Sequence, residues 1–330
     1  MEKIVLGNSG LTASRIGLGT WAIGGWMWGG TDEEESIRTI LKALHEGITL
    51  IDTAPAYGAG RSEEIVGKAL KEYGQRDQVI VATKVGLELL PGGGVRRNAS
   101  KAAIQKEIED SLRRLQTDYI DLYQVHWPDP LVPIAETAEA LHDLLKEGKI
   151  RAIGVSNFSP EQMREWMEVA PLHTDQPPYN LFEREIEKDV LPFCREHHIG
   201  TLLYGSLCRG LLTGKMSKDT VFQGDDLRKV DPKFQPPRYD QYLQAVEKLT
   251  DLARSYGKSL TEFAVRWILD QPGASVALWG ARHPQQLDPV KGIDGWHIHE
   301  ADLKRVDEIL AETIQDPAGP EFMAPPSRDH

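Results

Sequence analysis

Short apolar runs alternate with amphipathic stretches along nearly the whole chain. The amphipathic stretches have a helical period; from Lys101 onward, for example, apolar residues recur every three or four positions. Ser159 and Pro160 mark the start of another helix, as N-cap and first helical residue. The apolar runs are short enough to be buried strands, and they cover residues 15–19, 49–54, 78–86, 119–127, 150–158, 173–180, 199–207 and 274–281.

The order of these elements predicts one (β/α)₈ barrel domain over residues 1–330. Strands that alternate with helices form a parallel sheet, and eight such units close into a barrel. A doubly wound sheet is the alternative, but it usually has fewer strands and often a G-x-G-x-x-G turn. The first strand here ends in GLGTWAIGG, which lacks that spacing.

Three segments lie outside the repeat. Residues 1–14 are predicted to form a β-hairpin around Gly7–Gly10 that caps the N-terminal end of the barrel. Residues 208–239 form a long connection after the seventh strand, and long loops in compact domains are often functional. The proline-rich C-terminal tail is either disordered or folded over a site.

Composition narrows the class of function. The chain has a formal net charge of −12, which disfavours a nucleic acid or an anionic membrane as partner. Its two cysteines, Cys194 and Cys208, form no disulfide framework and suit a reducing cytosol. The N-terminus has no signal-peptide pattern, and no apolar run approaches transmembrane length. We therefore expect a cytoplasmic protein.

Polar residues stand at the ends of successive apolar runs. Asp52, Lys84 and His126 end three of them, and Tyr57 follows in the loop after the first. The carboxyl ends of barrel strands meet on one face, where active sites lie. There Asp52 is expected to pair with Lys84, and the ammonium to lower the pKa of the Tyr57 phenol. His126 would orient a substrate oxygen.

This set of side chains suits the reduction of a carbonyl group. A phenol of adjusted pKa can protonate the oxygen of a carbonyl that receives a hydride. No side chain donates hydride, so a cofactor must supply it.

The motifs IDTAPAYG, TKVG and VHWPD resemble those of the aldo-keto reductase superfamily, and the resemblance extends over essentially the whole chain. The sequence looks closest to the bacterial general-stress branch. The resemblance implies a (β/α)₈ barrel that binds extended NADP(H) without a Rossmann motif. It also implies a catalytic tetrad of Asp52, Tyr57, Lys84 and His126, with Tyr57 as the general acid–base. The expected protein is a cytoplasmic, stress-related oxidoreductase of aldehydes, ketones and alcohols.

The same resemblance implies a cofactor site. Ser156 and Asn157 of GVSNF would hold the nicotinamide carboxamide together with Gln176, and Tyr204 would stack on the ring. The pyrophosphate loop, YGSLCRGLLTGK and beyond, contributes Leu207, Arg209, Gly210, Lys215 and, more loosely, Arg228. The motif WGARHPQQL would bind the adenosine end through Gly280, Arg282 and Gln286, with Arg282 at the 2′-phosphate. The remaining expected cofactor contacts are Gly19, Thr20, Trp21 and Asp52.

The substrate pocket is expected to contain Trp21, Tyr57, His126 and Trp127. No metal site is expected, because the spacing of CREHHIGTLLYGSLC matches no structural zinc pattern. A monomer is expected.

The sequence departs from the family pattern at the adenosine end. Gln286 stands where many members have a basic residue, and Pro289-Val290 replaces a Glu-Asn pair. Preference for the 2′-phosphate should therefore be moderate. At the seventh strand, Tyr204 is followed by Gly-Ser where Ser-Pro is common.

Two other functions fit the same barrel. The first is a cofactor-binding regulatory subunit that resembles the channel β-subunits of the family and turns over slowly. Those subunits carry Asn where this chain has His126. A lyase would form a Schiff base on Lys84 and would need no nicotinamide.

Overall fold

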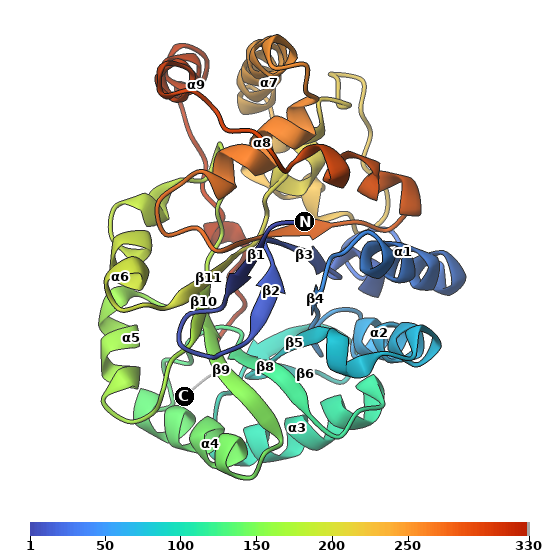
Figure 1. Cartoon of the computed structure of the whole chain (residues 1–330), viewed down its shortest axis with the longest axis vertical. Helices are drawn as coiled ribbons and strands as arrows, with labels where there is room; N and C mark the ends of the chain where they lie inside the picture. The colour runs from blue at the N-terminus through green and yellow to red at the C-terminus, as the bar shows by residue number, and fades with distance from the viewer. Residues whose placement is uncertain (329–330) are drawn as a thin grey trace.

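Eight parallel strands close into a barrel in the order β10-β11-β12-β3-β4-β5-β8-β9 (Figure 1). The computed structural model describes residues 1–328. Each of the eight predicted apolar runs contains one strand, which confirms the barrel and excludes the doubly wound sheet. The strands are β3 (Ile16–Gly19), β4 (Leu50–Asp52), β5 (Ile80–Val85), β8 (Ile120–Val125), β9 (Ile150–Ser156), β10 (Thr174–Gln176), β11 (Gly200–Leu203) and β12 (Val276–Gly280).

Helices surround the barrel, and several begin at caps that the sequence encodes. Ser159 and Gln162 form a reciprocal capping box, so the predicted helix start is confirmed. The helices that follow the first six barrel strands are α1 (Glu33–His45), α2 (Arg61–Tyr73), α3 (Lys101–Leu115), α4 (Ile134–Lys146), α5 (Pro160–Met167) and α6 (Val190–Glu196).

The last part of the chain adds an outer layer. All residues of helix α8 (Leu260–Leu269) except Glu262 are buried, and the helix packs against β12. The 3₁₀ segment η7 (Pro284–Gly292) packs against α1 and α8, in the place of an eighth barrel helix. Helices α7 (Arg238–Ser255) and α9 (Glu300–Thr313) pack against each other on the outside (Figure 1).

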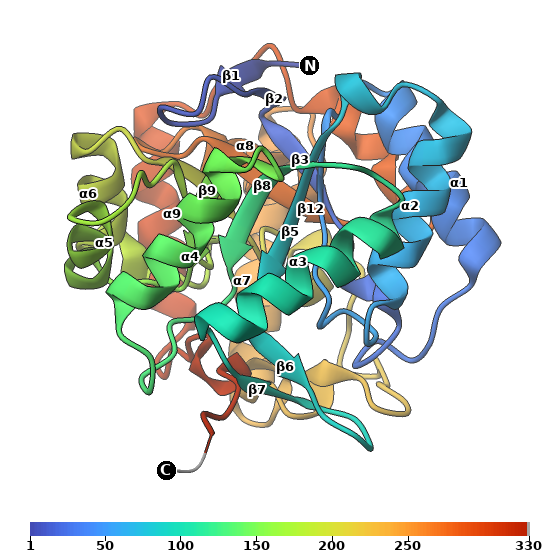
Figure 2. The same cartoon turned by 90° about the horizontal axis from the view of Figure 1, so that it is seen from below.

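The predicted hairpin, β1 (Lys3–Val5) and β2 (Thr12–Ser14), covers the N-terminal end of the barrel. Next to its turn, Leu6 is fully buried and packs with strand residues such as Leu50 and Leu122. A second hairpin, β6 (Leu87–Leu89) and β7 (Val95–Arg97), was not foreseen; it lies at the opposite end, near the C-terminus (Figure 2).

Two long segments also lie at this C-terminal end of the strands. The connection after β11 contains the short turns η4 (Cys208–Thr213), η5 (Leu227–Lys229) and η6 (Pro232–Phe234). The tail, with η8 (Glu321–Met323), reaches β7, where Arg97 N donates to Pro326 O at 3.0 Å. Of the two alternatives for the tail, folding over the barrel face is therefore correct as far as residue 328. Three further 3₁₀ turns are η1 (Ala22–Gly24), η2 (Arg76–Gln78) and η3 (Glu185–Glu187).

Across the part of the chain that the structure describes, every helix is too short or too polar to cross a membrane.

Candidate active site

The barrel brings Asp52, Lys84, Tyr57 and His126 together, as the sequence predicts. Asp52 ends β4, Lys84 lies in β5, and His126 directly follows β8. Lys84 Nζ donates to Asp52 Oδ2 at 2.7 Å and to the Tyr57 hydroxyl at 3.1 Å. Asp52 and Lys84 are 2% and 1% exposed. The ion pair is therefore held away from water, where the charge of Lys84 acts strongly on the neighbouring phenol.

The Tyr57 ring is fixed by aromatic neighbours and by a tight backbone turn. It meets the His126 ring edge-on at 5.8 Å and stacks on Trp21 at 6.0 Å. The loop that carries Tyr57 packs directly on Gly24, where an added Cβ would lie 2.6 Å from the Tyr57 carbonyl carbon. Gly58 has φ +67°, and its Cβ would meet Gly24 O at 2.1 Å, so only glycines allow this approach.

The pKa shifts correct one expectation. Burial raises the pKa of Tyr57 above its ordinary value, and the Lys84 ammonium offsets this only in part. The predicted net lowering is therefore wrong, because desolvation outweighs the neighbouring positive charge. The phenol keeps its proton at neutral pH.

Lys84 and His126 also have defined charge states. Burial alone would lower the pKa of Lys84, but Asp52 and Tyr57 raise it overall, so the side chain stays an ammonium. Burial and the charge of Lys84 lower the pKa of His126 well below its usual value, so the imidazole is neutral. The site thus holds a neutral proton donor beside a neutral imidazole and a fixed positive charge.

Sequence reasoning missed Gln124, a buried residue of β8. Its Nε2 donates to Asp52 Oδ1 at 3.1 Å, and Gln176 Nε2 donates to the same oxygen at 2.9 Å. The signal was present, because Gln124 stands two residues before His126 and so faces the same side of the strand. Gln124 was overlooked because it lies inside the run of residues 119–127, which was interpreted as an apolar strand.

The residues predicted to hold the nicotinamide form one hydrogen-bonded cluster. Asn157, with φ +62°, donates from Nδ2 to His126 O and to Ser156 Oγ, both at 3.1 Å. Ser156 Oγ donates to Gln176 O at 2.7 Å, and the Tyr204 hydroxyl donates to Asn157 Oδ1 at 2.8 Å. The ends of β9, β10 and β11 therefore meet beside His126.

Two loops are joined over this end of the barrel. Asp225 accepts from Met27 N at 2.7 Å and from Gly29 N at 3.2 Å, and Leu227 N donates to Met27 O at 3.0 Å. The segment after β3 and the long connection after β11 thus form one bridged structure.

Two predicted cofactor residues lie beside this bridge. Arg228 forms a fork with Asp226 at 2.9 and 2.6 Å, and its Cζ lies 5.5 Å from the Trp28 ring centroid. Arg282 donates from Nη1 to Trp28 O at 2.6 Å. Gln286 Oε1 accepts from the backbone N–H groups of Arg282 and His283 at 2.7 and 3.1 Å, which fixes the start of η7.

Some predicted cofactor residues have their side chains occupied within the protein. Arg209 is 7% exposed and pairs with Glu183 and Asp231, both at 2.5 Å. Lys233 joins the same buried cluster through Glu183 at 2.7 Å. Thr20 is fully buried, and its hydroxyl bonds Asp52 O at 2.9 Å and Ser62 Oγ at 2.7 Å. These side chains shape the loops around the site.

The remaining predicted residues lie at the barrel mouth or on the loops beside it. Gly280 is exposed at the end of β12, with room for a Cβ, and pairs in register with Gly19 of the neighbouring strand β3. Leu207 and Gly210 are half-buried, whereas Lys215 is exposed. Trp127 lies under Arg97, with 5.3 Å from the guanidinium carbon to the ring centroid.

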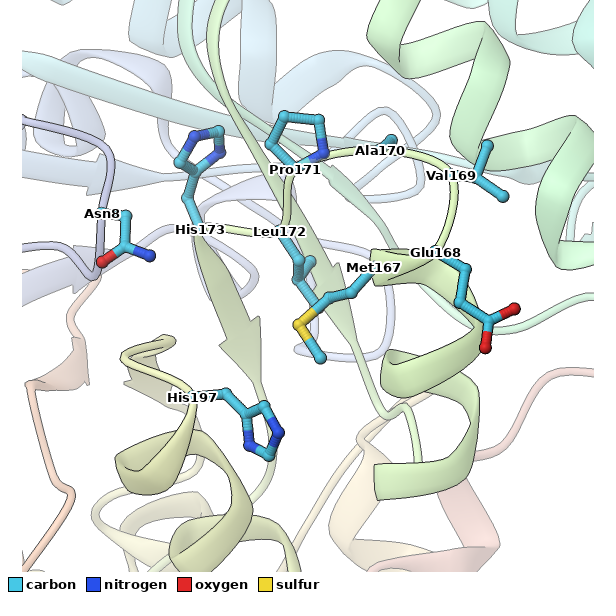
Figure 3. A pocket seen from close by; sticks show the side chains of 9 residues that line it. All are labelled: Asn8, Met167, Glu168, Val169, Ala170, Pro171, Leu172, His173 and His197. Carbon is cyan, nitrogen blue, oxygen red and sulfur yellow. The ribbon is translucent and has the colours of Figure 1, made fainter.

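A hollow of about 410 Å³ is lined by none of these residues. Figure 3 shows the side chains that line it. Asn8, His173, His197 and residues 167–172 line it, at the end of the barrel that the N-terminal hairpin covers. It contains none of the tetrad. Within residues 1–328, no three His, Cys, Asp or Glu side chains gather in a way that could hold a metal ion.

The chain belongs to the aldo/keto reductase family, whose model matches residues 15–311. Aldo/keto reductases are oxidoreductases that work with nicotinamide cofactors, so family membership makes the barrel mouth the expected site of carbonyl chemistry.

Two relatives and two solved structures are similar over nearly their whole length. The chain is 64% identical to aldo-keto reductase YhdN of Bacillus subtilis, over all of this chain and 99% of that protein. It is 39% identical to an NADH-specific methylglyoxal reductase of Escherichia coli, over 96% and 100%. Glycerol dehydrogenase AKR11B4 of Gluconobacter oxydans is 54% identical with TM-score 0.89, over 98% and 99%. The holo form of AKR11C1 from Bacillus halodurans is 31% identical with TM-score 0.78, over 94% and 96%.

Proposed function

We propose that this protein is an NADP(H)-dependent reductase of aldehydes and ketones, with Tyr57 as the general acid. The observation that carries the proposal is the position of Lys84 Nζ, within hydrogen-bond distance of both Asp52 and the Tyr57 hydroxyl. A reduced nicotinamide, when bound, supplies the hydride to the carbonyl carbon.

The protein's own groups act on the carbonyl oxygen. Neutral His126 donates a hydrogen bond that orients this oxygen toward Tyr57. The phenol gives its proton to the oxygen as negative charge develops there. Lys84 stabilises the phenolate that remains, and Asp52 keeps the lysine charged and in place. In the reverse direction, the phenolate accepts the proton of an alcohol.

The choice of NADP(H) rests on Arg282, with Arg228 nearby. Within residues 1–328, Nε and Nη2 of Arg282 have no hydrogen-bond partner, so they can donate to a phosphate. The chain has a formal net charge of −12, and a bound phosphate therefore needs such a local cation. The relative described as NADH-specific is 39% identical to this chain and makes cofactor choice a necessary part of the test.

A Schiff-base lyase is disfavoured by the state of Lys84. Its amine is ion-paired with Asp52 and protonated, whereas a Schiff base needs a free amine. A slow regulatory subunit is disfavoured by His126, which lies against the Tyr57 ring. A cytoplasmic location, a role in stress and a monomeric state stay predictions from the sequence.

The experiment that tests the proposed function is a panel of aldehydes and ketones, each followed by loss of reduced-nicotinamide absorbance with NADPH and NADH in parallel. We expect turnover with several carbonyls, and we expect the rate to saturate at a lower concentration of NADPH than of NADH. Absence of turnover with either nicotinamide across the panel would contradict the proposal.

A further inference from the structure

The carboxylate of Asp52 determines how two buried glutamines are oriented. An ionised carboxylate only accepts hydrogen bonds. Its Oδ2 is used by Lys84, and the amides of Gln124 and Gln176 approach its Oδ1 at 3.1 and 2.9 Å. Both glutamines must therefore turn Nε2, their donor atom, toward Asp52.

Gln124 then uses the second hydrogen of the Gln176 amide. Gln124 Oε1 accepts from Gln176 Nε2 at 2.9 Å, so both N–H groups of Gln176 are occupied. Gln176 Oε1 has no partner among the described residues, although the residue is only 2% exposed. This oxygen is not one of the fully buried atoms that lack a partner, so it stays open to accept a hydrogen bond from a ligand.

The barrel leaves room for Gln124 in this position. Gln124 is fully buried, and it pairs in register with Gly154 of β9. An added Cβ at Gly154 would lie 2.9 Å from Gln124 Cγ, so a larger residue there would displace the side chain. The glutamine orientation is thus supported by the neighbouring strand.

The polar groups next to Gln176 have also used their hydrogens. Ser156 donates to Gln176 O, Asn157 donates twice from Nδ2, and Tyr204 donates to Asn157 Oδ1. What remains free is acceptor capacity on Ser156 Oγ, Asn157 Oδ1 and Gln176 Oε1. This cluster suits the NH₂ of a primary amide.

We propose that Gln124 is a positioning residue that fixes the Gln176 amide, so that the site selects a nicotinamide carboxamide over rings that lack an NH₂ group. The inference rests on the proposed function, because it takes a nicotinamide dinucleotide as the ligand. A ring with an acetyl group in place of the carboxamide offers no N–H donor, and a ring with a carboxylate would face the acceptors with negative charge.

The test is a fluorescence titration of wild type, Gln124→Leu and Gln124→Met with NADP⁺ and its 3-acetylpyridine analogue. Wild type should bind NADP⁺ about twofold to tenfold more tightly than the analogue, the range expected for one neutral hydrogen bond. In both variants the ratio should fall to about one, because the Gln176 amide is no longer fixed. Gln271→Leu makes the same chemical change just after α8, where Gln271 Nε2 donates to Trp267 O at 2.9 Å, and should leave the ratio at the wild-type value.

The outcomes separate the two proposals. If wild type binds neither compound, nor NAD⁺, the proposed function fails. If wild type binds both compounds equally, or if a folded Gln124 variant keeps the wild-type ratio, the role of Gln124 is overturned while the reductase proposal stands. Should neither variant fold, wild type itself decides: the nicotinic-acid dinucleotide phosphate should bind more weakly than the acetyl analogue, and binding equal to NADP⁺ would overturn the inference.

Discussion

Lys84 Nζ lies 3.1 Å from the hydroxyl of Tyr57, and the same ammonium is held by Asp52 at 2.7 Å. The phenol therefore sits beside a buried positive charge that cannot move away when the phenol loses its proton. Burial keeps the phenol protonated in the resting protein, since it raises the pKa of Tyr57. Burial thus keeps the phenol protonated before transfer, and the Lys84 ammonium stabilises the phenolate after it.

Lys84→Met should reduce both stability and activity. Asp52 is 2% exposed and would be left as a buried carboxylate without its counter-charge, which typically costs about 3–5 kcal/mol in the free energy of unfolding. Urea unfolding measures this change. The matched control is Lys68→Met, whose ammonium is 45% exposed beside Glu33 and should change stability by less than about 1 kcal/mol. Adding Asp52→Asn to Lys84→Met should restore part of the stability; no recovery would argue against the pair.

The pH dependence of the two reaction directions should differ. Reduction needs a protonated Tyr57, whose pKa is raised, so its rate should stay flat from neutral pH to about pH 10. Alcohol oxidation needs the phenolate and should rise through the same range. The pKa of His126 is lowered well below its ordinary value, so no inflection should appear near about pH 6.5. Profiles of kcat/KM measure this, and an inflection there that His126→Asn removes would contradict the assigned charge state.

Glu107 should make stability depend on pH at a distance from the site. Burial is the main cause that raises its pKa to about 8, although Gly86 N donates to its carboxylate at 3.2 Å. The folded state therefore binds a proton that the unfolded state loses near about pH 4.5, and this contribution to stability is lost as pH rises toward about 8.

Glu107→Gln keeps the neutral form at every pH. The variant and the wild type should be about equally stable near pH 4, and the variant should be more stable above about pH 8. Thermal unfolding across this range is the measurement. Parallel curves for the two proteins would show that Glu107 titrates normally.

Arg282→Ala should remove most of the preference for NADPH over NADH. A charge-assisted hydrogen bond contributes about 1.5–3 kcal/mol, or roughly tenfold to a hundredfold in affinity. NADH binding should barely change, since it has no 2′-phosphate. Titration of both cofactors into both proteins gives the ratio, with Arg254→Ala, 72% exposed on α7, as the control. An unchanged ratio in Arg282→Ala would exclude this arginine from phosphate recognition.

The strands and the tetrad were predictable because they follow from periodic patterns and from residue type at strand ends. Asp52, Lys84 and His126 each end a run that reads as buried, and a barrel brings such ends together. The net pKa of Tyr57 was not predictable, because desolvation depends on how Trp21 and the neighbouring loops cover the ring. The pairing of Arg209 with Glu183 and Asp231 was also not predictable, because these residues are far apart in the sequence and no local pattern indicates that they are partners.

The most direct test of the central claim compares wild type with Tyr57→Phe for NADPH binding and for reduction of several aldehydes. The variant removes the proton donor and keeps the ring that packs against Trp21 and His126. We expect the variant to bind NADPH within a few-fold of wild type and to lose about 10²–10⁴-fold in reductive kcat/KM. Reduction within a few-fold of wild type, by a folded variant that binds NADPH normally, would contradict Tyr57 as the acid.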